Sequence, residues 1–229
     1  MKVPMKRHSL APTLLAAALA ALTPALGAAA EDLPPNARLV LLARNGDLAG
    51  VQRLLAAGAS PDARNRLGET ALVIALKRGD AALANAMLEA GTDVNIAAAN
   101  GTTALMAAAY GGRADLVEPL LARGADPLAA DRIGKTAMVY AAAQGHDAIV
   151  KSLLAHGVPP DARYRNDITA LMWAAGYGHD AVVRTLLAAG AHADLRDNRG
   201  KSAADIAREA GFAATAALVE GAARVAVAH

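Results

Sequence analysis

The sequence contains no cysteine among its 229 residues. This absence excludes disulfide bonds, thiolate metal sites and a cysteine nucleophile. It also excludes a bacterial lipoprotein, because such a protein carries its lipid on a cysteine. Aromatic residues make up only 3% of the chain, whereas hydrophobic residues make up 55%. Alanine supplies much of that apolar fraction, which indicates closely packed helices with few large side chains.

The first thirty residues have the pattern of a secretory signal peptide. Basic residues at positions 2, 6 and 7 precede an uncharged apolar stretch (10–22), and small residues at 28–30 precede Glu31. We predict that residues 1–30 are removed and that the mature chain is periplasmic or secreted, without membrane association. An uncleaved membrane anchor is the alternative, but the stretch is shorter than the ~20 apolar residues of a spanning helix.

An excess of charge of one sign is also missing from the mature chain. The full sequence carries a formal charge of +2, and removing the three basic residues of the signal leaves −1. Binding to nucleic acid requires a basic footprint that neutralises phosphates. The charge balance therefore argues against a nucleic-acid partner.

The sequence is organised by residues that recur every 33 positions, without insertion or gap. One glycine series is interrupted only by Asp167, and a second series and a row of leucine pairs keep the same period. The three series are Gly68, Gly101, Gly134, Asp167, Gly200; Gly46, Gly79, Gly112, Gly145, Gly178, Gly211; and Leu54-Leu55, Met87-Leu88, Leu120-Leu121, Leu153-Leu154, Leu186-Leu187.

Each repeat predicts two helices. A Thr or Ser, such as Thr169, stands where its side chain can cap the first helix. Gly178 and its equivalents end that helix, because glycine readily adopts the left-handed turn conformation. Residues 179–190 follow with apolar side chains at the i, i+3, i+4 spacing of an amphipathic second helix. One such pair cannot bury its own apolar face, so the units must stack.

The stretch DRIGKTAMVYAAAQGH (131–146) resembles the ankyrin repeat, and the resemblance covers about residues 32–223. It implies an all-α repeat solenoid of stacked helix pairs with projecting turns or β-hairpins. The signal peptide and the TALM-type units are similar to those of exported bacterial ankyrin repeat proteins. The expected domain, 31–229, has about six units and a short C-terminal tail. The units are 32–64, 65–97, 98–130, 131–163, 164–196 and the cap 197–223.

The chain departs from the family pattern in two ways. The proline that usually follows the threonine is alanine in every unit, and the usual histidine two positions later is Val, Met or Asp. A Thr–His hydrogen bond is therefore missing, and apolar packing must replace it. Pro119 lies inside a predicted second helix, where it removes a hydrogen bond and is expected to kink the helix.

Gly134-Lys135-Thr136 and Gly200-Lys201-Ser202 imitate the end of a phosphate-binding P-loop. A true P-loop needs glycine five residues earlier, where this chain has Ala129 and Leu195. The repeat itself supplies the glycine and the Thr or Ser, so we expect no nucleotide site.

His146 and His179 occupy the same repeat position and raise the alternatives of a metal site or a catalytic pair. No carboxylate is placed in register with them, and a structural role is favoured. Trp173 shares a repeat position with Ile74, Ala107 and Tyr140, which favours packing over ligand stacking. We expect no catalytic residue, cofactor or metal, and a chain that is not an enzyme.

The resemblance implies that the projecting turns and the ends of the first helices line a concave face. These positions are rich in Arg and Lys and carry one acidic residue. This predicts a monomer that binds an acidic protein partner, although basic, solvated turn tips are the simpler alternative. The predicted binding residues are Arg66, Glu69, Lys77, Arg78, Tyr110, Arg132, Lys135, Gln144, Arg165, Asn166, Tyr177 and Lys201.

Two non-enzymatic functions are consistent with this pattern. The first is a protein–protein interaction module in the bacterial periplasm. The second is an accessory or immunity-type protein that protects or inhibits one exported enzyme, which would differ only in its partner. An enzyme, the third class, lacks a catalytic constellation.

Overall fold

The computed structural model describes residues 33–227, so the predicted signal peptide lies outside the described residues. Within this range the chain forms twelve α-helices, one short 3-10 turn and no β-strand. The projecting segments are therefore turns, with a single antiparallel β-bridge between Arg64 and Thr70. The prediction of an all-α repeat solenoid is confirmed.

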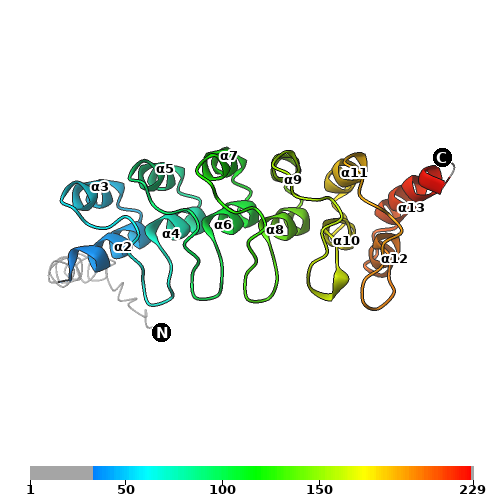
Figure 1. Ribbon diagram of the computed structural model, residues 1–229, viewed down its shortest axis with the longest axis horizontal. Helices are drawn as coiled ribbons and strands as arrows, with labels where there is room; N and C mark the ends of the chain where they lie inside the picture. The colour runs from blue at the N-terminus through cyan, green and yellow to red at the C-terminus, as the bar shows by residue number, and fades with distance from the viewer. Residues whose placement is uncertain (1–32, 228–229) are drawn as a thin grey trace, which may run out of the picture.

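The helices form two layers that run along the array (Figure 1). The even-numbered layer contains α2 (Pro35–Asn45), α4 (Ala71–Arg78), α6 (Ala104–Tyr110), α8 (Ala137–Gln144), α10 (Ala170–Gly176) and α12 (Ala203–Glu209). The odd-numbered layer contains α3 (Leu48–Ala56), α5 (Ala81–Glu89), α7 (Ala114–Ala122), α9 (Asp147–Ala155), α11 (Asp180–Ala188) and α13 (Ala213–Val227).

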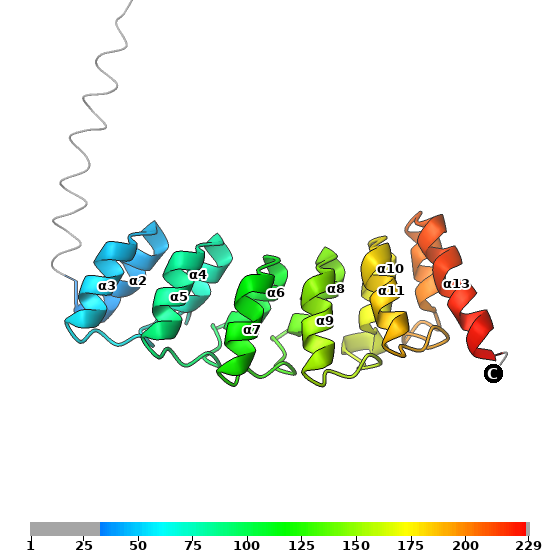
Figure 2. The ribbon, with the colours of Figure 1, turned by 90° about the horizontal axis from the view of Figure 1, so that it is seen from above.

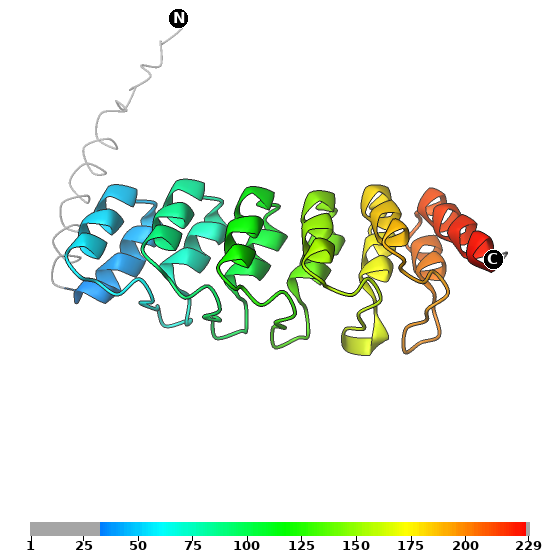
Figure 3. The same ribbon diagram turned by 45° about the horizontal axis from the view of Figure 1, so that its top comes forward.

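Five loops project from the even-numbered layer, away from the odd-numbered helices (Figures 1 and 3). Their tips are residues 65–69, 98–102, 131–135, 164–168 and 197–201. The helix pairs at the two ends lean in opposite directions in Figure 2, so the array is curved.

The predicted helix starts and ends are confirmed. Thr136 Oγ1 accepts a hydrogen bond from Val139 N at 3.4 Å, and Thr70, Thr103, Thr169 and Ser202 cap their helices in the same way. These bonds satisfy backbone N–H groups that have no partner within the helix. At the other end of α4 and α8, a glycine with φ of 72° and 77° closes the helix in the left-handed conformation.

The even-numbered helices are buried because they lie between neighbours in both directions along the array. Every residue from Ala71 to Leu76 is buried, as is every residue from Ala104 to Ala109. Alanine at many of these positions allows the helix backbones to approach closely. The buried side chains form one hydrophobic core that extends from Leu39 to Val219.

In two of the leucine pairs the members are not equivalent. Leu153 and Leu186 are completely buried, whereas Leu154 and Leu187 are only partly buried at the edge of the core. In these two pairs the first member therefore carries most of the packing energy. Both members are buried in Met87-Leu88 and Leu120-Leu121, and both are partly buried in Leu54-Leu55.

Pro119 lies inside helix α7 as predicted, and the helix continues through it from Ala114 to Ala122. Between residues 33 and 227, every helix is too short or too polar to cross a bilayer.

Replacing Leu153 with Ala is expected to lower the free energy of unfolding by about 2–5 kcal/mol, because a fully buried leucine leaves a cavity. Leu154→Ala is the matched control and is expected to cost about 1 kcal/mol. Urea denaturation followed by circular dichroism measures both. Equal losses for the two variants would contradict the assignment of the core position.

Candidate protein-binding face

The tips of three of the five projecting loops are held by a side-chain acceptor at the first residue of the loop. In the loop 131–135, Asp131 Oδ1 accepts hydrogen bonds from Ile133 N at 3.0 Å and Lys135 N at 2.9 Å. Asn65 and Asp197 hold two other loops in the same way. The backbone of the loop is thereby fixed. Side chains that the repeat pattern does not specify, such as Lys135, are available to contact a partner.

Neighbouring loops are joined by backbone hydrogen bonds, with one exception. Within the described residues, no such bond joins the loop 131–135 to the loop 164–168. The three bonds that join other neighbours are Ala99 N to Leu67 O (2.7 Å), Arg132 N to Asn100 O (3.0 Å) and Asn198 N to Asn166 O (3.0 Å).

A second row of links between units is interrupted at the same junction. In this row a side-chain oxygen of one unit accepts a backbone N–H of the next. Between the loop that joins α7 to α8 and the loop that joins α9 to α10, the two positions are Leu128, which has no side-chain acceptor, and Pro159, which has no N–H. The intact links are Asp93 N to Asp62 Oδ1 (2.9 Å), Asp126 N to Asn95 Oδ1 (2.9 Å) and His192 N to Asp161 Oδ1 (2.8 Å).

The loop 164–168 differs from the others in its backbone. Tyr164 replaces the usual acceptor, and Asp167 replaces the glycine. Asn166 and Asp167 adopt φ values of 64° and 59°, and they are the only non-glycine residues with positive φ in the described range. Such conformations cost energy for residues with a Cβ, although Asn and Asp tolerate them best.

An aromatic and cationic cluster lies next to this loop. The Lys135 ammonium lies 4.8 Å from the ring centroid of Trp173 and 5.5 Å from that of Tyr140. Tyr110 packs edge-on against Tyr140 at 5.8 Å, and Tyr177 stacks on Trp173 at 6.1 Å. Four of the six aromatic residues of the chain are therefore gathered around one lysine.

Asp131 also fixes the position of this cluster. Its Oδ2 accepts a hydrogen bond of 2.6 Å from the Tyr140 hydroxyl, while its Oδ1 holds the loop backbone. Burial and this hydrogen bond to a carboxylate raise the pKa of Tyr140, so the ring stays neutral. One buried carboxylate thus orients both the ring and the loop that carries Lys135.

Two predicted binding residues are neutralised within the chain, since Lys77 Nζ lies 2.7 Å from Glu69 Oε1 and Lys201 pairs with Glu209. Arg78 donates a hydrogen bond to the Arg44 carbonyl at 2.8 Å but keeps its positive charge. Burial acts to raise the pKa of Glu69, but hydrogen bonds from Lys77 and Asn65 outweigh it and lower that pKa. Glu69 is therefore a partner for Lys77.

The remaining predicted cations are in a different position. Arg66, Arg78, Arg132, Lys135 and Arg165 have no ion pair among the residues that the structure describes, and all but Lys135 are exposed. Arg165 backs onto the loop of Lys135, since a Cβ built on Gly134 would lie 3.2 Å from its Cβ. Three of these cations, Arg132, Lys135 and Arg165, thus lie together where the links between loops are interrupted, whereas Arg66 and Arg78 belong to the predicted unit 65–97.

The other predicted residues surround this centre. Tyr110 and Tyr177 end their helices with 58% and 53% of their surface exposed. Asn166 lies at the tip of the unusual loop, and Gln144 is exposed at the end of α8. Tyr140 and Trp173 are not among the predicted binding residues, because their repeat position predicted packing. Both are half-buried, unlike Ile74 and Ala107 at the same repeat position, and their rings face Lys135. The sequence signal that could have identified these rings as part of the site is Lys135, five residues before Tyr140.

The two histidines link neighbouring units. His146 Nε2 lies 3.2 Å from the Tyr110 carbonyl oxygen, and His179 Nε2 lies 3.0 Å from that of Ala143. Arg113 makes the equivalent contact with Gly79 O. Between residues 33 and 227, no group of three or more His, Asp or Glu side chains is arranged to hold a metal ion.

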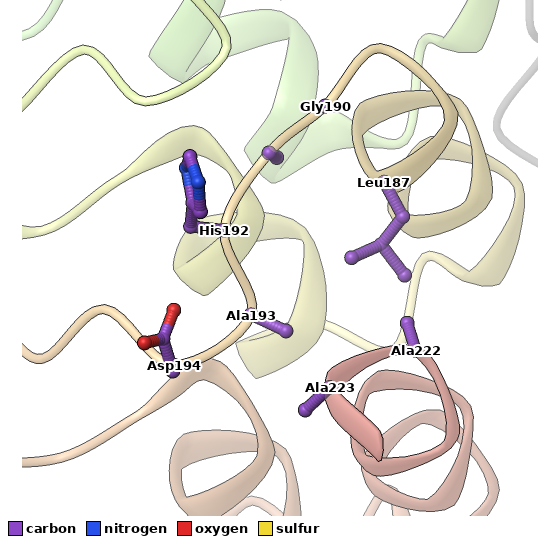
Figure 4. Close-up of a pocket in the computed structure, with 8 residues that line it drawn as sticks. Leu187, Gly190, His192, Ala193, Asp194, Ala222 and Ala223 are labelled. Atoms are coloured by element: carbon purple, nitrogen blue, oxygen red, sulfur yellow. The ribbon is translucent and has the colours of Figure 1, made fainter. Parts of the chain in front are cut away.

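A cavity of about 440 Å³ lies at the C-terminal end of the array (Figure 4). Leu187, Ala193, Ala222 and Ala223 point into the space between α13 and the loop before α12, while His192 and Asp194 lie on the other side of that loop. His192 pairs with Asp161, and this hydrogen bond raises its pKa. None of the predicted binding residues lines this cavity, and the polar groups that catalysis requires do not converge in it.

A protein-family model described as ankyrin repeats (3 copies) matches residues 39–131 and 129–197. Together the two matches span well over half of the chain and include all residues of the aromatic and cationic cluster. Comparison with curated proteins gives no significant match.

Replacing Asp167 with Gly is expected to stabilise the fold by about 0.5–1 kcal/mol. A left-handed conformation costs a non-glycine residue about 1–2 kcal/mol, and greater freedom of the unfolded chain returns about 0.4–1 kcal/mol. The Arg163–Asp167 contact that is lost is long, at 3.8 Å, and exposed. Asn198→Gly, at an exposed loop position without positive φ, is the control and should destabilise slightly. A lower melting temperature for the Asp167 variant would contradict the assigned strain.

Proposed function

The chain belongs to the ankyrin repeat family, and we propose that this protein–protein interaction module works in the bacterial periplasm, where its concave face binds an acidic protein. Ankyrin repeat proteins are typically not enzymes, and no catalytic family is detected in the sequence. The proposal therefore concerns the place where the module acts, the face that it uses and the chemistry of its partner.

The observation that carries the proposal is the group of unpaired cations Arg132, Lys135 and Arg165 beside exposed tyrosines. Aromatic and arginine side chains are enriched among residues that dominate binding energy. A cationic patch on a mature chain of net charge −1 attracts an acidic surface and orients it during encounter. The cations at Lys77 and Lys201 contribute less, because carboxylates of the chain already neutralise them.

The proposed location rests on the sequence of residues 1–30. The basic start, the uncharged apolar stretch and the small residues before Glu31 have the order that export and cleavage require. An exported chain without cysteine is insensitive to the oxidising conditions of the periplasm. The partner should then also be an exported protein.

Charge reversal of the central cations should abolish binding of the partner. The triple variant Arg132→Glu, Lys135→Glu, Arg165→Glu is immobilised and exposed to a periplasmic extract, and bound proteins are quantified by mass spectrometry. We expect a loss of at least about tenfold relative to the original chain, equivalent to about 1.4 kcal/mol.

The matched control reverses three exposed arginines outside the concave face, namely Arg53, Arg123 and Arg184. Its capture should equal that of the original chain, and both variants should keep the helical circular dichroism spectrum. Retained capture by the first variant would refute the proposed face. Recovery of a single exported enzyme would identify the accessory function.

Processing of the N-terminus tests the location separately. We expect the protein isolated from the periplasm of an expressing bacterium to begin near Glu31, as measured by intact mass and N-terminal sequencing. Ala30→Lys should block cleavage, because signal peptidase requires a small residue there. Recovery of the full-length chain from the cytoplasm alone would contradict export.

A further inference from the structure

Three cavities follow one another along the central part of the concave face. The first lies between α6 and α8, the second between the loops 131–135 and 164–168, and the third between α10 and α12. Their volumes are about 210, 160 and 380 Å³. Each is offset from the next by one step of the array.

The middle cavity is basic. Lys135 and Arg165 line it together with Ile133, Trp173 and the hydroxyl-bearing Tyr164. The Lys135 ammonium faces aromatic rings and has no carboxylate partner in the described part of the chain. Ring faces hold the ammonium in place but leave it uncompensated by negative charge. Lys201, at the equivalent repeat position, is instead neutralised by Glu209.

Tyr164 forms part of the wall of the middle cavity. Its hydroxyl oxygen is buried near Thr136 and is out of reach of a ligand. Lys135 and Arg165 are therefore the charged groups that a ligand oxygen would meet in this cavity.

The two outer cavities are lined mainly by apolar groups. Met106, Ala107 and the rings of Tyr110 and Tyr140 line the first, with Lys77, Asn100 and Thr102 beside them. Ile168, Met172, Trp173, Tyr177 and Ile206 line the third, with Arg199 beside them. The exposed faces of Tyr110 and Tyr177 form their outer walls, so an inserted apolar side chain would cover aromatic surface that is now in contact with water.

The spacing of the cavities restricts the kind of ligand. Packed helices lie about 8–10 Å apart, and an extended chain advances about 3.3–3.6 Å per residue. An extended peptide therefore passes from one cavity to the next in about three residues. A surface helix would advance only about 1.5 Å per residue and would present its side chains at a different spacing.

We propose that the partner binds through an extended acidic segment of the form apolar-x-x-Asp/Glu-x-x-apolar. Its carboxylate binds Lys135 in the middle cavity, with Arg165 beside it, and its two apolar side chains enter the outer cavities. The inference rests on the proposed function and deepens it, since it specifies the chemistry of the segment that the concave face binds.

A selection from a random nonapeptide library tests the motif. Peptides that bind the immobilised mature chain are sequenced, and the best are titrated by calorimetry and by the emission of Trp173, the only tryptophan in the sequence. We expect enrichment of Asp or Glu with apolar residues three positions to either side. Replacing that Asp or Glu by Asn or Gln should weaken binding at least tenfold.

Lys135→Met and Lys201→Met form the matched pair of protein variants. Methionine keeps an apolar stem over the rings and removes the charge. We expect at least tenfold weaker binding for Lys135→Met, less than twofold for Lys201→Met, and unchanged melting temperatures for both. Equal effects of the two variants, or enriched peptides without an acidic position, would overturn the inference.

The outcomes separate this inference from the proposed function. If no peptide is enriched while charge reversal of Arg132, Lys135 and Arg165 still abolishes capture of the partner, the extended segment is wrong and the proposed face stands. If that triple reversal leaves capture unchanged, the proposed face is wrong, and any peptide selected at Lys135 is no model of the partner.

Discussion

Close stacking of the even-numbered helices is the constraint on which the rest of the structure depends. Alanine-rich stretches such as 104–109 are completely buried, and one core runs from Leu39 to Val219. Because each helix is covered on both sides by its neighbours, its stability comes mainly from adjacent units and little from its own length. The stack also fixes the spacing of the loops, which is why Gly101 must lack a side chain: a Cβ there would lie 2.8 Å from the Cα of Asp131. Side chains that point away from the stack are free of this constraint, and the possible binding groups are found among them.

The links between neighbouring loops are interrupted at one place in the described part of the chain. Backbone bonds, and side-chain bonds to the backbone, are both missing between the loop that joins α7 to α8 and the loop that joins α9 to α10, where Leu128, Pro159, Tyr164 and Asp167 replace the usual residues. The helices remain joined there by His179 and by the pair Thr185–Asp147. The stack is therefore continuous, while its loops separate enough to leave a cavity lined by Lys135 and Arg165. Departures from the repeat coincide with three unpaired cations, Arg132, Lys135 and Arg165, which is the arrangement expected if local stability is given up for binding.

The fold could be predicted because its signals are local and repeated. Thr136 caps a helix, Gly145 ends it and Leu153 packs in the core, and the 33-residue period places the same groups in every unit. The division into six units and the cleaved signal stay predictions. The candidate face was harder to predict, since ion pairs such as Lys77–Glu69 and Lys201–Glu209 join residues eight positions apart. Counting charges at loop positions overestimated the number of cations without an ion pair. The pairing between a loop and the first helix of the same unit, which neutralises Lys201 but not Lys135, is a property of the folded chain.

The contribution of Trp173 and Tyr140 could not be inferred from their repeat position alone. Ile74 and Ala107 at that position are buried, but the larger rings reach past the helix packing to Lys135. Asp131 orients Tyr140 and the Lys135 backbone together, so the three groups behave as one preformed site. A ligand that binds such a site loses little free energy to reorganisation of the protein. Gly134-Lys135-Thr136 imitates a phosphate-binding sequence, yet its glycine shapes the loop and its threonine caps α8. Only the lysine is left for recognition. Because it faces aromatic rings, has no carboxylate partner in the described part of the chain and lines the cavity between two loops, a carboxylate is its best-matched ligand.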